Sequence, residues 1–248
     1  SIANKMGRTA GENAVGGQAE FKSAAGTAIV KLFDHTFART GISEREATAQ
    51  NFKIGLSVVY AGHHASYYPG AETLCIKLIF DDESGRILGA QVSGKEGVDK
   101  RIDVVATAIY KHMTVAELIE VDLAYAPPYS SAKDPVIVAG MVATNIWSLK
   151  CHPYTPASLA QRLKENRPYL LIDVRTDGER QQGAISDSIH MPIDELRNRH
   201  AELPKDRELI VYCHRGQRGY VGARMLRNLG YPNAKNLLGG YSYWQMFR

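Results

Sequence analysis

The sequence predicts two folded domains. Residues 21–148 are predicted to form an α+β domain with an antiparallel sheet plus helices, because strand-like runs precede the longer helical patterns. Residues 155–248 are predicted to form an α/β domain with a parallel sheet wrapped by helices, because short apolar runs alternate with helical patterns. Residues 149–154 are the expected linker, and residues 1–20 contain a short predicted helix.

Four runs rich in β-branched and aromatic residues predict the strands of the first domain. They are Thr27–Asp34, Ile54–Tyr60, Thr73–Phe80 and Ile87–Val92. Cys75 lies in the third run and is expected to be a core residue. Residues 81–86 are expected to form the hairpin turn between the last two strands.

Capping patterns predict where the helices begin. Ser43 with Glu46, and Thr114 with Glu117, are predicted capping boxes at the starts of two short helices. An amphipathic pattern at Ile102–Ile109 predicts a longer helix between them.

A capping residue followed by proline predicts two further helix starts, at Asp134 and at Thr155. The first of these helices is expected to end near Trp147. In the second domain, Tyr169–Val174 is a predicted strand, and Asp194 is a predicted helix cap.

The composition does not point to nucleic acid or membrane as a partner. The 248 residues include 30 basic and 26 acidic ones, so the net charge of +4 is mild, and no basic run is interleaved with aromatic residues. No apolar run approaches the roughly 18–20 residues of a membrane span, and no signal peptide is visible. Because the chain begins with Ser in the middle of a pattern, we expect it to be part of a longer protein.

The three cysteines do not predict disulfides or a metal site. Cys75, Cys151 and Cys213 are an odd number, and none belongs to a C-x-x-C pair, which favours a reducing compartment such as the cytoplasm. Zinc sites show paired ligands at close spacing, which this chain lacks. We expect Cys151 to be an inert surface residue of the linker, with a relay of sulfur as the weaker alternative.

Cys213 lies between a predicted buried strand, Leu209–Tyr212, and a predicted helix that ends near Gly230. The N–H groups at a helix N-terminus are unpaired and attract anions. Arg215 and Arg218 add positive charge beside the cysteine. This combination favours the thiolate, the nucleophilic form of cysteine, so the sequence predicts a reactive residue.

A buried cysteine that only ends a core strand is the plainer interpretation of Cys213, because free cysteines pack as small hydrophobic residues. The glycines and arginines around it favour the reactive interpretation. Cysteine phosphatases build a similar turn, but their pattern places the essential arginine where this chain has Gly219. Arg218 comes one residue earlier, so the loop is shorter and phosphatase activity is not expected.

The stretch Cys213-His-Arg-Gly-Gln-Arg218 resembles the active-site loop of rhodanese-type sulfurtransferases. Ile172-Asp173-Val174-Arg175 upstream and Leu238-Gly239-Gly240-Tyr241 downstream are similar to the same family, and the resemblance covers about residues 153–248. It implies that Cys213 accepts a sulfane sulfur, becomes a persulfide and passes the sulfur to a nucleophile. Thiosulfate, polysulfide and coenzyme A persulfide are the donors that we expect.

The resemblance also assigns roles around the cysteine. Asp173 and Arg175 are expected to form a structural pair beside the loop, because buried Asp-Arg pairs often brace a turn. Arg215 and Arg218 are expected to recognise the anionic donor, since a planar guanidinium suits oxyanions. The residues expected to bind the substrate are His214, Arg215, Gly216, Gln217, Arg218 and Gly219.

Residues 1–148 resemble the C-terminal part of flavin-dependent pyridine-nucleotide disulfide reductases, in particular coenzyme A disulfide reductases fused to a rhodanese domain. The segments that carry this resemblance are residues 2–8, 64–71 and 122–130. It implies that residues 1–20 are the last helix of a flavin domain, that residues 21–148 form a dimerisation domain, and that the protein is a homodimer.

Tyr67 and Tyr125 match two tyrosines that in this family reach toward the redox cysteine beside the partner's flavin. Their phenols are therefore expected to be catalytic, by donating hydrogen bonds to a thiolate or a disulfide. FAD, NAD(P)H and coenzyme A are implied for the full-length enzyme. A non-catalytic dimerisation or regulatory fragment is the alternative to a sulfurtransferase, although the complete loop around Cys213 argues against it.

We predict that this chain by itself binds no cofactor. No Gly-x-Gly-x-x-Gly follows a predicted strand, so no dinucleotide site is visible. The purified chain should therefore be colourless, and an absorption spectrum with flavin bands would contradict this prediction.

Overall fold

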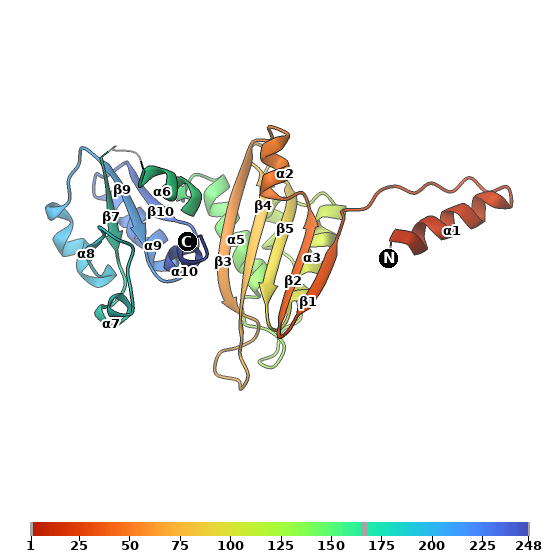
Figure 1. The fold of residues 1–248 in the computed structure, drawn as a ribbon, viewed down its shortest axis with the longest axis horizontal. Helices are drawn as coiled ribbons and strands as arrows, with labels where there is room; N and C mark the ends of the chain where they lie inside the picture. Colours follow the sequence, from red (N-terminus) through yellow and green to blue (C-terminus); the bar gives the residue numbers. More distant parts are fainter. Residues whose placement is uncertain (1, 165–167, 248) are drawn as a thin grey trace.

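The computed structural model describes residues 2–164 and 168–247, which include two sheets with helices packed on them (Figure 1). The first sheet is antiparallel, with the strand order β1-β2-β5-β4-β3. Its strands are β1 (Ala28–Leu32), β2 (His35–Gly41), β3 (Ile54–Gly62), β4 (Thr73–Asp81) and β5 (Ile87–Gly94). The helices of this domain are α2 (Glu44–Ala49), α3 (Val98–Tyr110), α4 (Val115–Leu118) and α5 (Pro135–Trp147). The predicted α+β class is confirmed.

The second sheet is parallel, with the strand order β6-β10-β9-β7-β8. Its strands are β6 (Pro153–Tyr154), β7 (Tyr169–Asp173), β8 (Ile189–His190), β9 (Glu208–Tyr212) and β10 (Ala234–Leu237). The helical segments are α6 (Pro156–Arg162), α7 (Asp177–Gln181), α8 (Ile193–Arg199), η1 (His200–Glu202), α9 (Gln217–Asn228) and α10 (Gly240–Gln245). The predicted α/β class is confirmed as well.

Strand β2 was not predicted from the sequence. Thr27–Asp34 was predicted to be one strand, whereas the chain reverses at Phe33 and Asp34, and Leu32 pairs with His35. Phe33 has a φ of 54°, a conformation that usually requires glycine or asparagine, so the turn carries no ordinary hairpin signal. The first sheet consequently has five strands instead of the four that were expected.

The predicted cap at Asp194 is wrong. Helix α8 begins after Pro192, whose carbonyl accepts the N–H of Leu196 at 3.0 Å, so Asp194 already lies inside the first turn. The other predicted caps are confirmed, including both capping boxes and the caps at Asp134 and Thr155. Two residues of the expected linker, Pro153 and Tyr154, pair with β10 as an edge strand.

Two cysteines lie elsewhere than expected. Cys75 was expected in the core, but it is only half-buried on the face of the sheet opposite the helices. Cys151 was expected at the surface, but only 4% of it is exposed, because it packs beside Leu238 where the two domains meet. Neither residue forms a disulfide.

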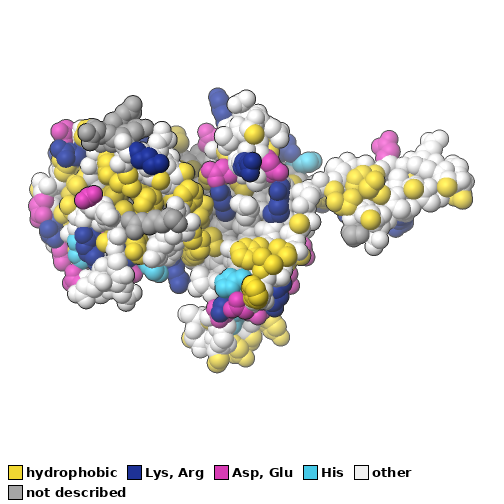
Figure 2. Space-filling view, viewed as in Figure 1, with side chains coloured by type: hydrophobic (Ala, Val, Ile, Leu, Met, Phe, Trp, Pro, Cys, Tyr) yellow, Lys and Arg dark blue, Asp and Glu magenta, His cyan; other side chains and the backbone are white. Residues whose placement is uncertain are grey.

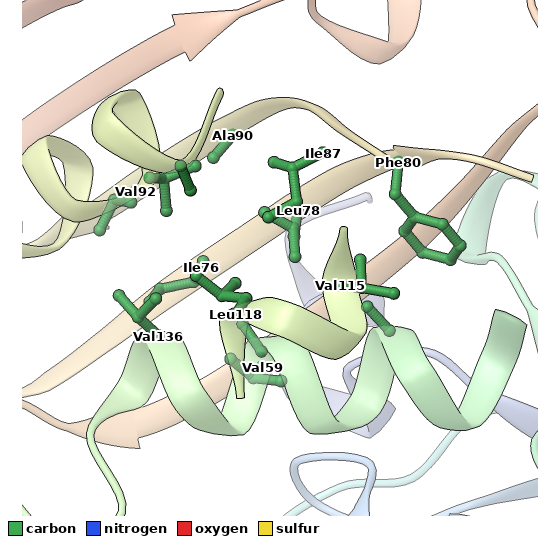
Figure 3. Close-up of a cluster of buried hydrophobic side chains, with 14 of the residues drawn as sticks. Val59, Ile76, Leu78, Phe80, Ile87, Ala90, Val92, Val115, Leu118 and Val136 are labelled. Atoms are coloured by element: carbon green, nitrogen blue, oxygen red, sulfur yellow. The ribbon is translucent and has the colours of Figure 1, made fainter. Parts of the chain in front are cut away.

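Side chains that alternate between buried and more exposed positions along β4 and β5 form the core of the first domain. Ile76, Leu78 and Phe80 point from one face of β4 toward the helices, as expected for a strand with one buried face (Figure 3). Val115 and Val136, from α4 and α5, close this core from the other side (Figure 3).

The parallel sheet is buried on both faces, as parallel sheets usually are. Val211 of β9 packs against Leu226 of α9 on one face. Ile210 and Tyr212 pack on the other face with Trp244 of α10. Successive residues of the same strand thus serve two cores, and the apolar run at Leu209–Tyr212 reflects this.

Helix α5 is apolar around most of its circumference. Val136, Ala139 and Ala143 face the first sheet and are fully buried. Val138 and Val142 lie on its other side, toward the second domain. A helix with this composition needs partners on both sides. Helix α5 therefore lies between the two domains, and both contribute to its burial.

Exposed apolar side chains include a group on the first sheet and several on helix α1. Figure 2 shows one group over β1 and β2, where Ile29, Val30, Leu32 and Phe33 are exposed. Figures 1 and 2 also show helix α1 (Ile2–Ala14), which extends away from both sheets and buries none of its residues. No helix in the described ranges is both long and apolar enough to cross a membrane.

A buried ion pair fixes the loops at one end of the first sheet. Arg101 donates to Asp134 at 2.9 Å and to the carbonyl of His63 at 2.7 Å, while Ser130 donates to the same carboxylate at 2.7 Å. Burial opposes ionisation of Asp134, but the N–H of Val136 and the Arg101 guanidinium outweigh it, so the pKa of Asp134 is lowered.

We predict that Asp134→Ala lowers the free energy of unfolding by about 3–5 kcal/mol, because it leaves the buried Arg101 charge unpaired. Urea denaturation followed by circular dichroism measures this change. Asp103→Ala is the control, because Asp103 is exposed on α3. A loss no larger than that of the control would contradict the prediction.

Candidate active site

Cys213 lies where the sequence predicts it, directly after β9 and before α9. Its sulfur accepts the N–H of Gly216 at 3.1 Å, and only 2% of the residue is exposed. Gln217, Arg218 and Gly219 form the first turn of α9, where N–H groups have no intrahelical acceptor. The turn thus presents backbone donors at a helix N-terminus beside a cysteine sulfur, an arrangement that favours an anion.

The shape of the turn depends on glycine at two positions. Gly216 has a φ of 103°, which non-glycine residues rarely adopt. A Cβ on Gly240 would lie 2.3 Å from the carbonyl oxygen of Cys213 and 2.9 Å from the nitrogen of Gly216. Gly240 is therefore explained by how closely α10 approaches the Cys213 turn, whereas a Cβ on Gly239 would lie 2.5 Å from the Cβ of Tyr243.

Helix α10 holds the turn through its N-terminal N–H groups. Tyr241 donates to the carbonyl of Cys213 at 2.8 Å, and Ser242 donates to the carbonyl of His214 at 2.9 Å. Gly219 packs closely against Asn236 on another side of the turn. A Cβ at Gly219 would lie 2.4 Å from the Asn236 side-chain oxygen. The turn consequently has little freedom to change shape.

Arg218 forms an ion pair with Glu179, for which no role was predicted from the sequence. The guanidinium donates to the two carboxylate oxygens at 2.7 and 2.5 Å. These bonds lower the pKa of Glu179 to about 2. The pKa of Arg218 is raised, first by Glu179 and also by the neighbouring Cys213 sulfur. The Thr176-x-x-Glu179 capping box is the signal that could have identified this carboxylate.

Asp173 and Arg175 form the predicted pair, with both side chains fully buried. Two bonds of 2.9 and 2.8 Å join them, and the Tyr212 hydroxyl donates to Asp173 at 3.0 Å. Burial opposes ionisation of Asp173, yet its pKa is lowered, because Arg175 donates to it. Arg175 also donates to the carbonyl of Gly183 at 2.7 Å, so the pair ties β7 to the segment after α7.

The other predicted binding residues differ in exposure and in charge. Arg215 is exposed, and its guanidinium donates to Thr73 of the first domain at 3.3 Å. The pKa of His214 is lowered by partial burial and then by Arg215, so this side chain is expected to be neutral near pH 7. Gln217 is exposed at the start of α9.

Tyr67 and Tyr125 come together from two loops of the first domain, with their hydroxyls 3.5 Å apart. They are 75% and 50% exposed, and this contact raises the pKa of Tyr125. No hydrogen bond or ring contact among the described residues joins this pair to Cys213. The predicted site residues therefore fall into two groups, the tyrosine pair and the Cys213 turn.

No cluster of three or more His, Cys, Asp or Glu side chains suited to a metal ion occurs in residues 2–164 and 168–247. The Cys213 site therefore combines a cysteine sulfur with backbone N–H donors and guanidinium groups, an arrangement suited to nucleophilic chemistry at sulfur.

The two domains each match a protein-family model. Residues 27–136 match the dimerisation domain of pyridine nucleotide-disulphide oxidoreductases, and residues 155–247 match the rhodanese-like domain. The chain thus carries an oxidoreductase dimerisation domain followed by a rhodanese-like domain, in agreement with the resemblance drawn from its motifs.

Three individual proteins show which oxidoreductases this chain is similar to. The chain is 45% identical over 124 residues to a coenzyme A disulfide reductase of Staphylococcus aureus, across 50% of the chain and 28% of that protein. It is similar to the reduced Bacillus anthracis CoADR-RHD structure, with 43% identity, a TM-score of 0.92, and coverage of 98% of the chain and 43% of that one. It is also similar to a NAD-dependent persulfide reductase from A. fulgidus, with 40% identity, a TM-score of 0.85, and coverage of 98% and 44%. The chain therefore spans less than half of each relative.

The Arg218–Glu179 pair predicts a pH dependence. The pKa of Glu179 falls from its usual 4.5 to about 2 in the folded state, so the pair stabilises the fold above pH 4.5 and this contribution is lost as the pH falls toward 2. Glu179→Gln should be less stable than the wild type at neutral pH, and the difference should shrink across that range. Urea denaturation at a series of pH values measures it.

Glu195→Gln is the matched control, because Glu195 pairs with Arg199 at 2.8 Å on the exposed surface of α8. A difference between Glu179→Gln and the wild type that stays constant with pH would rule out a stabilising role for the ionised Glu179.

Proposed function

We propose that this chain is a sulfurtransferase module that carries sulfane sulfur as a persulfide on Cys213. The observation that carries the proposal is the position of the Cys213 sulfur at the N-terminus of α9, where it accepts the Gly216 N–H at 3.1 Å. Unpaired N–H groups of the next turn are placed to hold the extra negative charge of a persulfide. The rhodanese-like family match at residues 155–247 supports this assignment.

In the proposed reaction, the Cys213 thiolate attacks the outer sulfur of thiosulfate. The S–S bond of thiosulfate breaks, sulfite leaves with the bonding electron pair, and Cys213 becomes a persulfide anion. An acceptor thiolate then attacks the terminal sulfur and takes it away, which restores the Cys213 thiolate. Polysulfide or coenzyme A persulfide would donate sulfur by the same exchange.

The surrounding residues have separate proposed roles. Arg215 is exposed and forms no ion pair with any described residue, so it is the guanidinium best placed to attract an anionic donor. Arg218 is paired with Glu179 and adds positive charge beside the sulfur, while Asp173 and Arg175 brace the strand end. His214, Gly216, Gln217 and Gly219 contribute mainly through their backbone.

The roles of the first domain concern a longer protein. We propose that this domain mediates a homodimer, and that Tyr67 and Tyr125 donate hydrogen bonds to a sulfur substrate of a coenzyme A disulfide or persulfide reductase. Sedimentation velocity tests the dimer, and a single-chain mass at high concentration would contradict it. We also propose the cytoplasm as the compartment, which fractionation of cells would test.

FAD and NAD(P)H are implied only through the relatives. Among the described residues, the loop after β9 carries a cysteine that the proposed reaction uses. No step of that reaction uses a dinucleotide.

We predict that the protein gains one sulfur atom on incubation with thiosulfate, or with coenzyme A persulfide, and loses it when cyanide is added. Intact-mass spectrometry measures both changes. Cys213→Ala should gain none, because it lacks the nucleophile, whereas Cys75→Ala and Cys151→Ala should behave as the wild type.

Two results would overturn this proposal. Gain of cyanide-labile sulfur by Cys213→Ala would place the carrier elsewhere. Failure of the wild-type chain to gain sulfur from either donor would favour a non-catalytic dimerisation or regulatory role instead.

A further inference from the structure

A cavity of about 480 Å³ lies between the two domains and reaches the Cys213 turn, because Arg215, Gly216 and Gln217 contribute to its lining. The first domain contributes β3, α5 and Lys133, and the second contributes the segment after Cys213, α9 and the end of β10. Its lining includes Lys133, Val138, Met141, Val142, Cys151 and Arg215. A volume of this size suits a small organic ligand.

The walls of this interdomain cavity are mostly apolar, and one of them runs along helix α5. Val138, Met141, Val142 and Asn145 follow the i, i+3, i+4, i+7 spacing of one helix face, so they form a stripe along α5. At 1.5 Å per residue, this stripe is about 10 Å long. The cavity therefore offers an apolar surface to a chain-like group.

The two cations of the lining come from segments near one end of β3. Ser131 donates to the carbonyl of Gly62 at 3.3 Å, and Lys133 follows two residues later. Arg215 donates to Thr73 at 3.3 Å, and Thr73 pairs with Gly62 across β3 and β4. Lys133 and Arg215 therefore both line the cavity from segments close to the Gly62 end of β3.

The charges at this end are not balanced by the protein. Neither Lys133 nor Arg215 forms an ion pair with a residue of the described ranges, and both are exposed. None of the lining residues is Asp or Glu. An anionic group placed between the two cations would therefore meet attraction and no opposing carboxylate.

The other end of the cavity is uncharged. The N–H of Cys151 donates to the Asn145 carbonyl at 2.8 Å, which places Cys151 at the C-terminal end of the α5 stripe. Burial raises the pKa of the Cys151 thiol to about 11, so this thiol stays neutral. Asn236 is 5% exposed and completes the wall.

A second open groove, on the outer face of the first sheet, lacks this imbalance. It is lined by Ile29, Val30 and Phe37 together with the cations Arg39 and Lys77. Both cations are already paired, Arg39 with Glu46 and Lys77 with Glu44. The interdomain cavity is therefore the better site for an anion.

We propose that the interdomain cavity binds a single-chain organic anion, with its head group between Lys133 and Arg215 and its apolar chain along α5 toward Cys151. The proposal goes beyond sulfur transfer. It shares Arg215 with the Cys213 turn, but Lys133, the α5 stripe and Cys151 lie outside that turn. A ligand of this kind matches the apolar walls of the cavity and the two cations that form no ion pair with a described residue.

The test uses the fluorescent probe anilinonaphthalene sulfonate, which has an apolar body and an anionic head. The probe is titrated into the full chain and then displaced with octanoate, octanol or octyltrimethylammonium, which share a chain but differ in head-group charge. Octanoate should displace the probe at a concentration about tenfold or more below that of octyltrimethylammonium. Equal displacement by all three compounds would overturn the proposal.

Variants locate the site. Lys133→Glu should weaken octanoate binding by about tenfold. Lys111→Glu is the matched control, since Lys111 lies beside Tyr110, away from the cavity, and should bind as the wild type. Phe37→Asp, which changes a residue that lines the outer groove, should also bind as the wild type. Binding that is lost in Phe37→Asp and kept in Lys133→Glu would place the ligand on the outer face and refute the interdomain site.

Discussion

The two hydrogen bonds from α10 to the Cys213 turn are the contacts on which the candidate active site depends. Each such bond contributes only about 0.5–1.5 kcal/mol net, but an unpaired buried carbonyl costs about 1–3 kcal/mol, so the turn is strongly tied to the helix. Gly240 makes the contact possible because it brings no side chain against the Cys213 carbonyl. The geometry of the sulfur is therefore fixed by residues far from it in the sequence.

Local signals predicted most of the fold and only part of the site. Capping boxes and strand-like runs predicted their elements because the determining contacts lie within a few residues of one another. Strand β2 was missed because Phe33 occupies a turn position that glycine or asparagine normally marks. Glu179 and the buried position of Cys151 were missed because both follow from contacts between distant segments. No periodicity in the sequence records such contacts.

The Cys213 turn also connects the two domains. Arg215 leaves the turn and reaches Thr73, at the start of β4, and β4 directly follows the loop that carries Tyr67. Leu238, which precedes the two glycines near the end of the chain, packs in the core of the first domain. The segments that shape the sulfur site are thus in contact with the domain that carries the tyrosine pair, although no hydrogen bond or ring contact joins the two groups within the described residues.

Helix α5 determines how separable the two domains are. One side of it belongs to the core of the first sheet, while the stripe with Val138 and Val142 faces the rhodanese-like domain. Cutting the chain at the linker would expose Val138 and Val142, which are only partly exposed now, more fully to water. The cost is about 25 cal/mol per Å² of newly exposed apolar surface. For this chain the rhodanese-like domain is more than an appended module, because it shelters one side of a helix that belongs to its neighbour.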